Sequence, residues 1–147
     1  ADEAGILRSY TERRGIVATI KFERENRGRE AQDQSYEFRG YDVRSDPDII
    51  EVKAFRDAAI EKAIELTKNE YETMSNKDNY RIYVIEESWD DIPKVNVISD
   101  PKTMRFNRHV KNVLKVVTSL SSEEYFVCDE AEWRGKISSS HNVNLVE

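Results

Sequence analysis

The run Ile49-Ile50-Glu51-Val52-Lys53 is the feature that most constrains how this chain can fold. Its β-branched residues favour a strand over a helix. Because successive side chains on a strand point to opposite faces, we expect Ile50 and Val52 in a core and Glu51 and Lys53 together on the other face. A carboxylate and an ammonium group on one face of a half-buried strand are costly to place without a use. The run therefore predicts a strand that carries a charged site.

A second acid, Asp42, lies shortly before this strand. We expect a strand over residues 41–44 with Asp42 at its end, a turn at Asp46-Pro47-Asp48, and a strand over residues 49–54. In this arrangement Asp42, Glu51 and Lys53 can converge on one point. Two carboxylates and a lysine at one point are what a divalent metal and an attacking water need. The alternative for Asp42 is a turn cap, and for Glu51 and Lys53 an exposed ion pair of little energetic value.

Composition narrows the class of protein. A chain of 147 residues is most simply one domain with a real core. The charged share is high at 35%, but the aromatic share of 10% argues against disorder. A single cysteine, Cys128, excludes an internal disulfide and suits a reducing, cytoplasmic (intracellular) setting. We expect no membrane association, because no apolar run approaches spanning length and no signal pattern opens the chain. The first residue is Ala1 rather than Met, which suggests a fragment of something longer.

The net charge of −6 argues at first against nucleic acid, but the charges are unevenly distributed. Residues 5–56 contain 11 Lys and Arg against 10 Asp and Glu, so the acidic excess lies in the remainder. Arginines around the predicted site could contact phosphates. The candidates are Arg24, Arg27, Arg29 and Arg44. For each of them, a solvated helix face is the competing interpretation.

Helical periodicity predicts a helix from Ile16 to about Glu30, which Gly28 ends or frays. Ile16, Ile20 and Glu23 fall on one face of this helix. Glu23 therefore points to the core side, where it either reaches the site or lies at the solvent edge.

The rest of the chain alternates strands and helices. Thr67 and Glu70 form a capping box that predicts the start of a helix ending near Asn76. Strands are expected near 62–66, 80–85, 95–98 and 125–128. The spacing of Phe106, Val110, Val113, Leu114 and Val117 predicts an amphipathic helix, which would carry His109 in a structural role. The polar tail from Ser138 has no clear pattern. We expect a domain over residues 1–104 and a helix-strand extension over residues 105–147 that packs on the same domain.

This element order, with the carboxylates on the first strands, resembles the restriction-endonuclease-like fold and its PD-(D/E)XK motif. Asp42 stands for the first acid and Glu51-Val52-Lys53 for the second acid and the lysine, while Tyr41 replaces the proline. Neighbouring segments strengthen the resemblance and are similar to the NO VEIN C-terminal-like domain (domain of unknown function 3883), often found behind helicase modules. These segments are Glu23-Arg24, Gly28-Arg29, Gly40-Tyr41-Asp42, residues 66–70, residues 80–84 and residues 98–101.

The resemblance implies an α/β (α+β) fold with a central mixed sheet flanked by helices. It also implies metal-dependent phosphodiester hydrolysis. Asp42, Glu51 and the carbonyl of Val52 would bind Mg²⁺ or Mn²⁺, Lys53 would act on water or phosphate charge, and Glu23 would complete the metal shell. Glu70 could add a further site residue, although the helix cap is its competing role.

Two classes of function follow. The first is a Mg²⁺-dependent nuclease acting on DNA, as a module of a larger repair or defence protein with a helicase or ATPase in the same or a partner chain. The second is a catalytically silent module of the same fold that binds nucleic acid or a partner. Retention of Asp42, Glu51 and Lys53 favours the enzyme.

Overall fold

The computed structural model describes residues 3–116 and 119–146. None of the helices in these ranges is long and apolar enough to cross a membrane. The elements follow in chain order: α1 (Glu3–Arg27), β1 (Gln32–Asp33), the 3₁₀ helix η1 (Ser35–Glu37), β2 (Val43–Ser45), β3 (Asp48–Ala54), β4 (Ile64–Thr67), α2 (Lys68–Asn76), β5 (Tyr80–Glu86), β6 (Lys94–Ile98), the 3₁₀ helix η2 (Pro101–Thr103), β7 (Asn107–Val116), β8 (Ser119–Cys128), α3 (Glu130–Gly135) and β9 (Ser139–Asn142).

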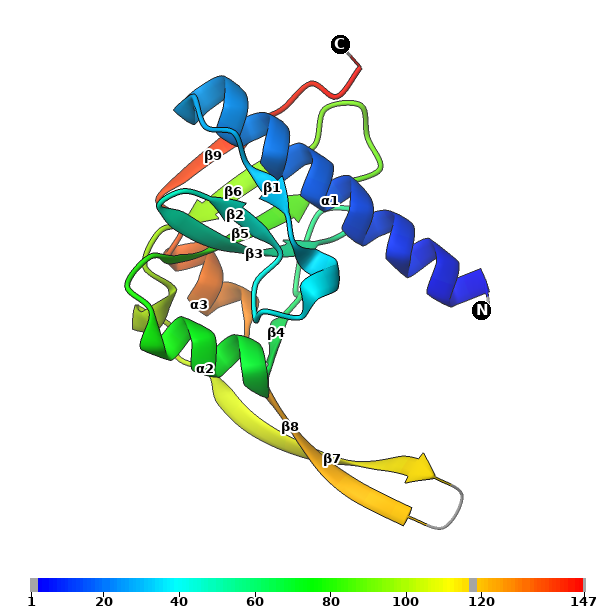
Figure 1. The fold of residues 1–147 in the computed structure, drawn as a ribbon. Coiled ribbons are helices and arrows are strands. Elements are labelled where there is room, and N and C mark those ends of the chain that lie inside the picture. The colour runs from blue at the N-terminus through cyan, green and yellow to red at the C-terminus, as the bar shows by residue number, and fades with distance from the viewer. Residues whose placement is uncertain (1–2, 117–118, 147) are drawn as a thin grey trace.

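A six-stranded mixed sheet in the order β1-β2-β3-β5-β6-β9 forms the centre of the molecule (Figure 1). β3 and β5 pair in parallel, whereas the other neighbours pair antiparallel. The predicted α/β class with a mixed central sheet is confirmed. The strands predicted at residues 49–54, 80–85 and 95–98 are confirmed within a residue or two of their ends.

The long helix α1 covers one face of this sheet (Figure 1). Ile16 and Phe22 pack there against Ile50 and Val52 of β3. The helix lies close to β3 at Gly15, where an added Cβ would stand 2.6 Å from the Cβ of Ala54. The predicted helix starts thirteen residues too late, because the polar first half of α1 offers little apolar periodicity. Its predicted end is confirmed, since Gly28 adopts the left-handed region with φ +65°.

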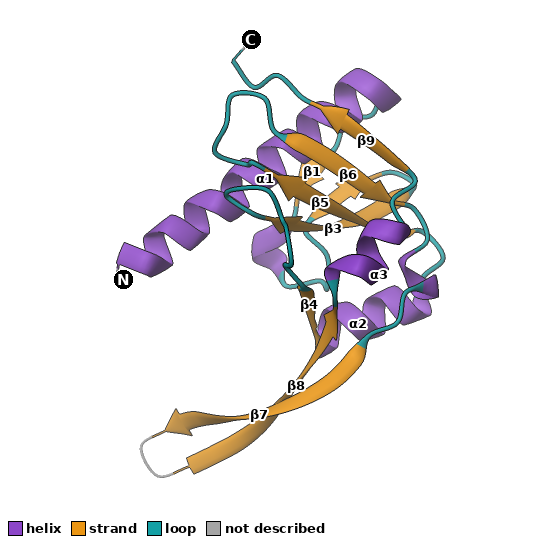
Figure 2. Cartoon of the chain, turned by 180° about the vertical axis from the view of Figure 1, so that it is seen from behind, coloured by secondary structure: helices purple, strands orange, loops and turns teal. Residues whose placement is uncertain are grey.

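The other face of the sheet is covered by α2 and α3 (Figure 2). Met74 of α2 and Trp133 of α3 pack against Ile82 and Val84 of β5. The capping box at the start of α2 is confirmed, because Thr67 Oγ1 accepts from the backbone of Glu70 and Glu70 accepts from the backbone of Thr67. The predicted strand near residues 62–66 is confirmed as β4.

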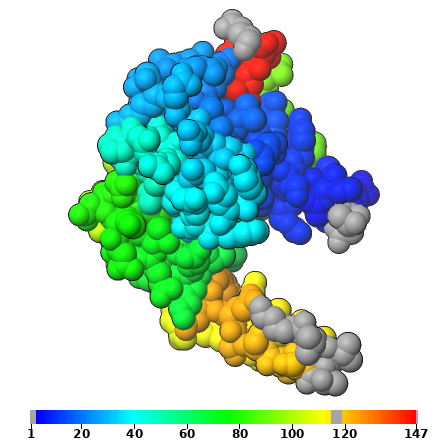
Figure 3. All heavy atoms as spheres, viewed as in Figure 1, coloured from blue at the N-terminus to red at the C-terminus, as the bar shows by residue number. Residues whose placement is uncertain are grey.

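β7 and β8 form a long antiparallel hairpin, here called the arm, that projects from the body of the molecule (Figures 1 and 3). β8 also pairs with β4, which attaches the arm to the body. The helix predicted from Phe106 to Val117 is therefore wrong over the described residues, and Val117 lies outside them. Val110 and Leu114 face one side of a strand just as readily as one side of a helix, and pairing with β8 decides between the two. His109 is exposed on β7 and stacks on Tyr125 at 5.2 Å between ring centroids.

The residues after position 104 also contribute to the body. β9 pairs with β6 at the edge of the main sheet, in a tail for which the sequence shows no pattern. Trp133 is fully buried in one core, and Val143 is buried in the other. The division of the chain at residue 104 stays a prediction.

Candidate functional site

Glu51 and Lys53 extend from β3 on the face opposite α1, as strand alternation predicts. Their neighbours Ile50 and Val52 point into the core beneath α1. Glu51 is only 2% exposed. An ordinary glutamate is ionised at neutral pH, so the fold places a group that is normally charged away from water. A carboxylate buried to this degree needs either partners in the protein or a ligand.

Asp42 is positioned by the strand that precedes β3 in the sheet. It lies immediately before β2 and not at its end, so that part of the prediction is wrong. Asp42 is bound to β3 at two points, because its backbone N–H donates to the carbonyl of Ile50 at 2.9 Å and its carboxylate accepts from the backbone N–H of Val52 at 2.9 Å. The carboxylate of Asp42 is thereby fixed beside Glu51.

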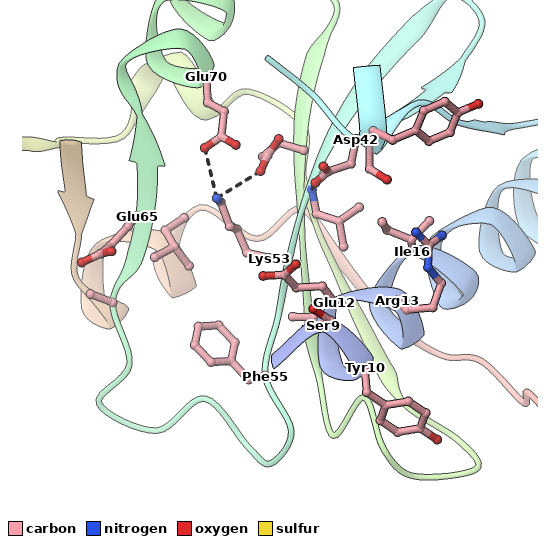
Figure 4. Close-up of a pocket in the computed structure, with 17 residues that line it drawn as sticks. Ser9, Tyr10, Glu12, Arg13, Ile16, Asp42, Lys53, Phe55, Glu65 and Glu70 are labelled. Atoms are coloured by element: carbon pink, nitrogen blue, oxygen red, sulfur yellow. Dashed lines mark hydrogen bonds and ion pairs between the residues drawn. The ribbon is translucent and has the colours of Figure 1, made fainter. Parts of the chain in front are cut away.

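Lys53 is held between two carboxylates. Its Nζ lies 3.0 Å from Oε2 of Glu51 and 3.2 Å from Oε1 of Glu70, as the dashed lines in Figure 4 show. The same oxygen of Glu70 accepts from the backbone of Thr67, so the capping and site roles of Glu70 coexist. The start of α2 therefore fixes the position of the lysine.

Burial and like charge act together on the acids of this site. Burial raises the pKa of Glu51 well above its usual value, and the neighbouring charges of Glu70 and Asp42 raise it further. Burial also raises the pKa of Asp42. Burial by itself would lower the pKa of Lys53, but the charges of Glu51 and Glu70 outweigh it and raise that pKa. The ammonium group of Lys53 thus contacts the carboxylates of Glu51 and Glu70 and also acts through its charge on that of Asp42.

One observation indicates that the site suits a divalent cation. Oε1 of Glu51 is buried, and within the described part of the chain it has no hydrogen-bond partner. The carbonyl of Val52 faces the same side as its N–H, toward Asp42, because both groups of a strand residue point to the same neighbour. Carboxylate and carbonyl oxygens are the ligands that Mg²⁺ accepts. Across residues 3–116 and 119–146, no three or more His, Cys, Asp or Glu side chains gather as a metal centre, so the backbone carbonyl and water would have to contribute.

The register of β2 with β3 ends at Ile50, and along the edge of β3 beyond that point a cleft of about 820 Å³ reaches both faces of the strand. Asp42, Glu51 and Lys53 open into this cleft, which α1 and β4 also border. Figure 4 shows Asp42 and Glu70 on one side of this cleft, Tyr10 and Phe55 on the opposite side, and Lys53 between them. Sequence reasoning missed the wall formed by α1, because the predicted helix began only at Ile16. The residues that α1 contributes are Ser9, Tyr10, Glu12, Arg13 and Ile16.

Glu23 lies on the other face of the sheet, in the core beneath α1. It is fully buried and accepts hydrogen bonds from Ser45 at 2.7 Å, Tyr83 at 2.5 Å and Arg27 at 2.9 Å. Tyr83 belongs to the core beneath α1, whereas Glu51 pairs in register with Ile82, which points to the opposite face. The structure therefore does not bring Glu23 together with Asp42, Glu51 and Lys53, and the solvent-edge alternative is also wrong.

The four candidate arginines differ in their surroundings. Arg27 and Arg29 each lie 2.7 Å from Oδ2 of Asp48, so ion pairs on the α1 side already occupy their guanidinium groups. Arg44 is exposed and pairs with Asp46 at 2.8 Å. Arg24 is exposed on α1. None of the four lines the cleft formed by the described residues.

Residues 11–98 match the family model described as Protein NO VEIN, C-terminal. Because the match covers more than half of the 147 residues, the chain belongs to this family, and the predicted resemblance to it is confirmed. The match contains Asp42, Glu51, Val52 and Lys53 and ends before the arm. No curated protein and no solved structure matches the chain.

Proposed function

We propose that this member of the NO VEIN C-terminal family is a Mg²⁺-dependent nuclease module of the PD-(D/E)XK, restriction-endonuclease-like type that hydrolyses DNA. The observation that carries the proposal is the buried carboxylate of Glu51, which lies beside Asp42 and Lys53 at the floor of an open cleft. A buried carboxylate with an oxygen that no described residue hydrogen-bonds is destabilising for the free protein. A divalent cation would offset that cost.

Asp42, Glu51 and the carbonyl of Val52 would hold Mg²⁺ or Mn²⁺, which when bound lowers the pKa of water and stabilises charge on the phosphate. Hydrolysis forms a bond between the water oxygen and phosphorus and breaks one P–O ester bond. The proton lost by the water ends on the departing oxygen. The ammonium group of Lys53, next to Glu51, would orient the water or neutralise the charge that develops on the phosphate oxygens.

Glu70 would act as a positioning residue in this mechanism. It holds Lys53 from the side opposite Glu51 and is itself fixed by the capping box of α2. A lysine held at two points loses little further freedom when the substrate binds, which favours a preorganised site.

Recruitment to DNA would come from a helicase or ATPase module in the same or a partner chain. Arg27 and Arg29 already neutralise Asp48, and the cleft itself is rich in carboxylates. We expect weak intrinsic DNA binding, which attachment to a second DNA-binding module would raise through effective concentration.

The test combines calorimetric titration of Mn²⁺ with a cleavage assay. We expect wild-type protein to bind Mn²⁺ and cleave DNA, and Asp42→Asn to lose both properties. Glu72→Gln is the matched control, because Glu72 is exposed on α2 close to the site. Metal binding without cleavage of any DNA would favour the silent binding module, and cleavage by Asp42→Asn at the wild-type rate would exclude this site.

A further inference from the structure

Three aromatic side chains border the cleft among its polar residues. Tyr10 of α1, Tyr36 of η1 and Phe55, which follows β3, all border it. Tyr10 is 47% exposed and Tyr36 is 71% exposed. Large rings that stay exposed beside a polar cleft lose hydrophobic stabilisation unless a ligand covers them.

The ring of Tyr10 is held in place although it is exposed. It packs edge-on against Trp89 with ring centroids 5.0 Å apart. Trp89 in turn donates a hydrogen bond from Nε1 to Thr11 at 2.8 Å, and the guanidinium of Arg56 lies 3.9 Å from its ring centroid. This support keeps Tyr10 oriented before any ligand arrives, which lowers the entropy cost of stacking on it.

Tyr36 is tied to the same frame. The preceding residue, Ser35, donates hydrogen bonds to Asp33 from its backbone at 3.0 Å and from its hydroxyl at 2.7 Å. Asp33 also forms an ion pair with Arg13, three residues after Tyr10 on α1. The two segments that carry Tyr10 and Tyr36 are thus joined across one ion pair.

The charge of the cleft argues against a duplex as its ligand. Five carboxylates line it against two cationic groups, Arg13 and Lys53. The carboxylates are Glu12, Asp42, Glu51, Glu65 and Glu70. One divalent cation would leave this lining still negative, so two phosphate backbones would meet repulsion. Stacking on aromatic rings does not need positive charge, but it does need unpaired bases.

We infer that the cleft binds a single-stranded segment of DNA, with unpaired bases stacked on Tyr10 and Tyr36 and one phosphate at Asp42, Glu51 and Lys53. The inference rests on the proposed nuclease function and gives its substrate class. A cleft of about 820 Å³ lies within the roughly 300–1,000 Å³ typical of small-molecule sites, which suits a few nucleotides rather than a duplex.

The experiment measures binding by fluorescence anisotropy with Ca²⁺ in place of Mg²⁺, because a divalent cation is needed to offset the carboxylates where the phosphate binds, and gel electrophoresis afterwards checks that the probes are intact. The probes are a labelled 12-nucleotide single strand, the duplex of the same sequence, and an abasic strand that keeps the phosphates without bases. We expect the single strand to bind most tightly. Stacking contributes about 1–3 kcal/mol per base, so Tyr10→Ala and Tyr36→Ala should each weaken this binding roughly 5- to 150-fold.

Two controls separate stacking from folding. Phe38→Ala removes an aromatic ring that is 86% exposed near Tyr36 but does not line the cleft, and it should change the affinity less than about twofold. Tyr10→Phe keeps the ring and the packing on Trp89, and it should bind the single strand as wild type does. Binding of the abasic strand should be weak and unaffected by Tyr10→Ala.

Tighter binding of the duplex than of the single strand, or unchanged binding by Tyr10→Ala and Tyr36→Ala, would overturn the inference. The outcome separates this inference from the nuclease proposal. If Mn²⁺-dependent cleavage of the single strand persists at the wild-type rate in both variants, the aromatic subsite is excluded while the nuclease stands. If the tyrosines govern single-strand binding but no DNA is cleaved with Mn²⁺, the subsite stands and hydrolysis is excluded.

Discussion

Two buried carboxylates on opposite faces of one sheet show how differently a protein can treat the same chemical group. Glu23, beneath α1, accepts three hydrogen bonds, from Ser45, Tyr83 and Arg27. Glu51, on the other face, contacts Lys53 through one oxygen, and the described residues offer its other oxygen no hydrogen bond. A buried charge with several hydrogen bonds is accounted for by the fold, whereas an unsatisfied one needs a further explanation, such as a catalytic role or a bound water or ion. Burial alone therefore does not distinguish Glu51 from Glu23, and the difference between the two lies in their hydrogen-bond partners.

Removing the charge of Glu51 should have the largest effect and should fall on activity. We expect Glu51→Gln to lower metal-dependent cleavage at least about a thousandfold, because a cation contributes several kcal/mol to transition-state stabilisation. The melting temperature should not fall below that of wild type, since the neutral side chain no longer faces Asp42 and Glu70 across a buried site. Cleavage rates and thermal melts of the same preparations check both statements. A cooperative melt well below that of wild type would place Glu51 with the structural acids.

Lys53 tests whether the ammonium group acts in catalysis or only balances charge. Lys53→Ala should reduce the cleavage rate by about 100- to 1,000-fold, the effect of losing one preorganised charge contact. Mn²⁺ binding should remain, because an ammonium group is not a metal ligand. Lys53→Arg should rescue poorly, since a planar guanidinium does not fit the position between Glu51 and Glu70. Lys77→Ala, on an exposed residue just after α2, is the control, and full activity of Lys53→Arg would indicate that bare charge suffices.

Glu23 should show the opposite pattern to Glu51. Glu23→Gln leaves Arg27 without one of its carboxylates and should lower the free energy of unfolding by about 3 kcal/mol, as breaking a buried ion pair does. Cleavage per folded molecule should stay at the wild-type level. Glu25→Gln, on an exposed position of the same helix, is the matched control. Denaturant unfolding and a cleavage assay measure the two effects. Loss of cleavage without loss of stability would show that Glu23 acts in the reaction and not in the fold.

Asp48 is a second acid on the α1 side that we expect to act in stability and not in cleavage, and the dependence of stability on pH tests this. Its expected effect is the smallest of the four. Burial alone would raise the pKa of Asp48, but hydrogen bonds from Arg27 and Arg29 outweigh it and lower that pKa. The folded pKa thus lies below the unfolded value near 3.9, so this stabilisation is present above about pH 4 and is lost as the pH falls through the folded pKa. Asp48→Asn should cost about 2 kcal/mol at pH 7 and should lose less stability on acidification than wild type.

Unfolding free energies between pH 2 and pH 7 measure the effect of Asp48, with Asp46→Asn as the control because Asp46 is largely exposed. Equal acid dependence of wild type and Asp48→Asn would show that the arginine cluster around Asp48 does not stabilise the fold.

The predictions that held concern local patterns. The alternation of Ile49 to Lys53 requires no partner to place Glu51 and Lys53 on one face, and the capping box at Thr67 and Glu70 closes within four residues. The predicted helix from Phe106 failed because its spacing is compatible with a strand, and the deciding partner, β8, comes from a later part of the chain. The aromatic residues of the cleft were missed for a similar reason, since Tyr10 and Tyr36 come to border one cleft only in the folded structure.

The sequence by itself determined that Glu23 lies on the core side of its helix and that Glu51 lies with Lys53 on the strand face opposite Ile50 and Val52, because side-chain direction follows from helical and strand periods. It could not determine which of the two acids is satisfied. The partners of Glu23 include Ser45 and Tyr83, which lie 22 and 60 residues further along the chain. The surroundings of Glu51 likewise depend on α2, which brings Glu70 to Lys53 across 17 residues. Hydrogen bonds between distant residues form only when the sheet and its helices assemble, so the tertiary structure decided that the carboxylate of Glu23 is satisfied within the protein and that one oxygen of Glu51 is not.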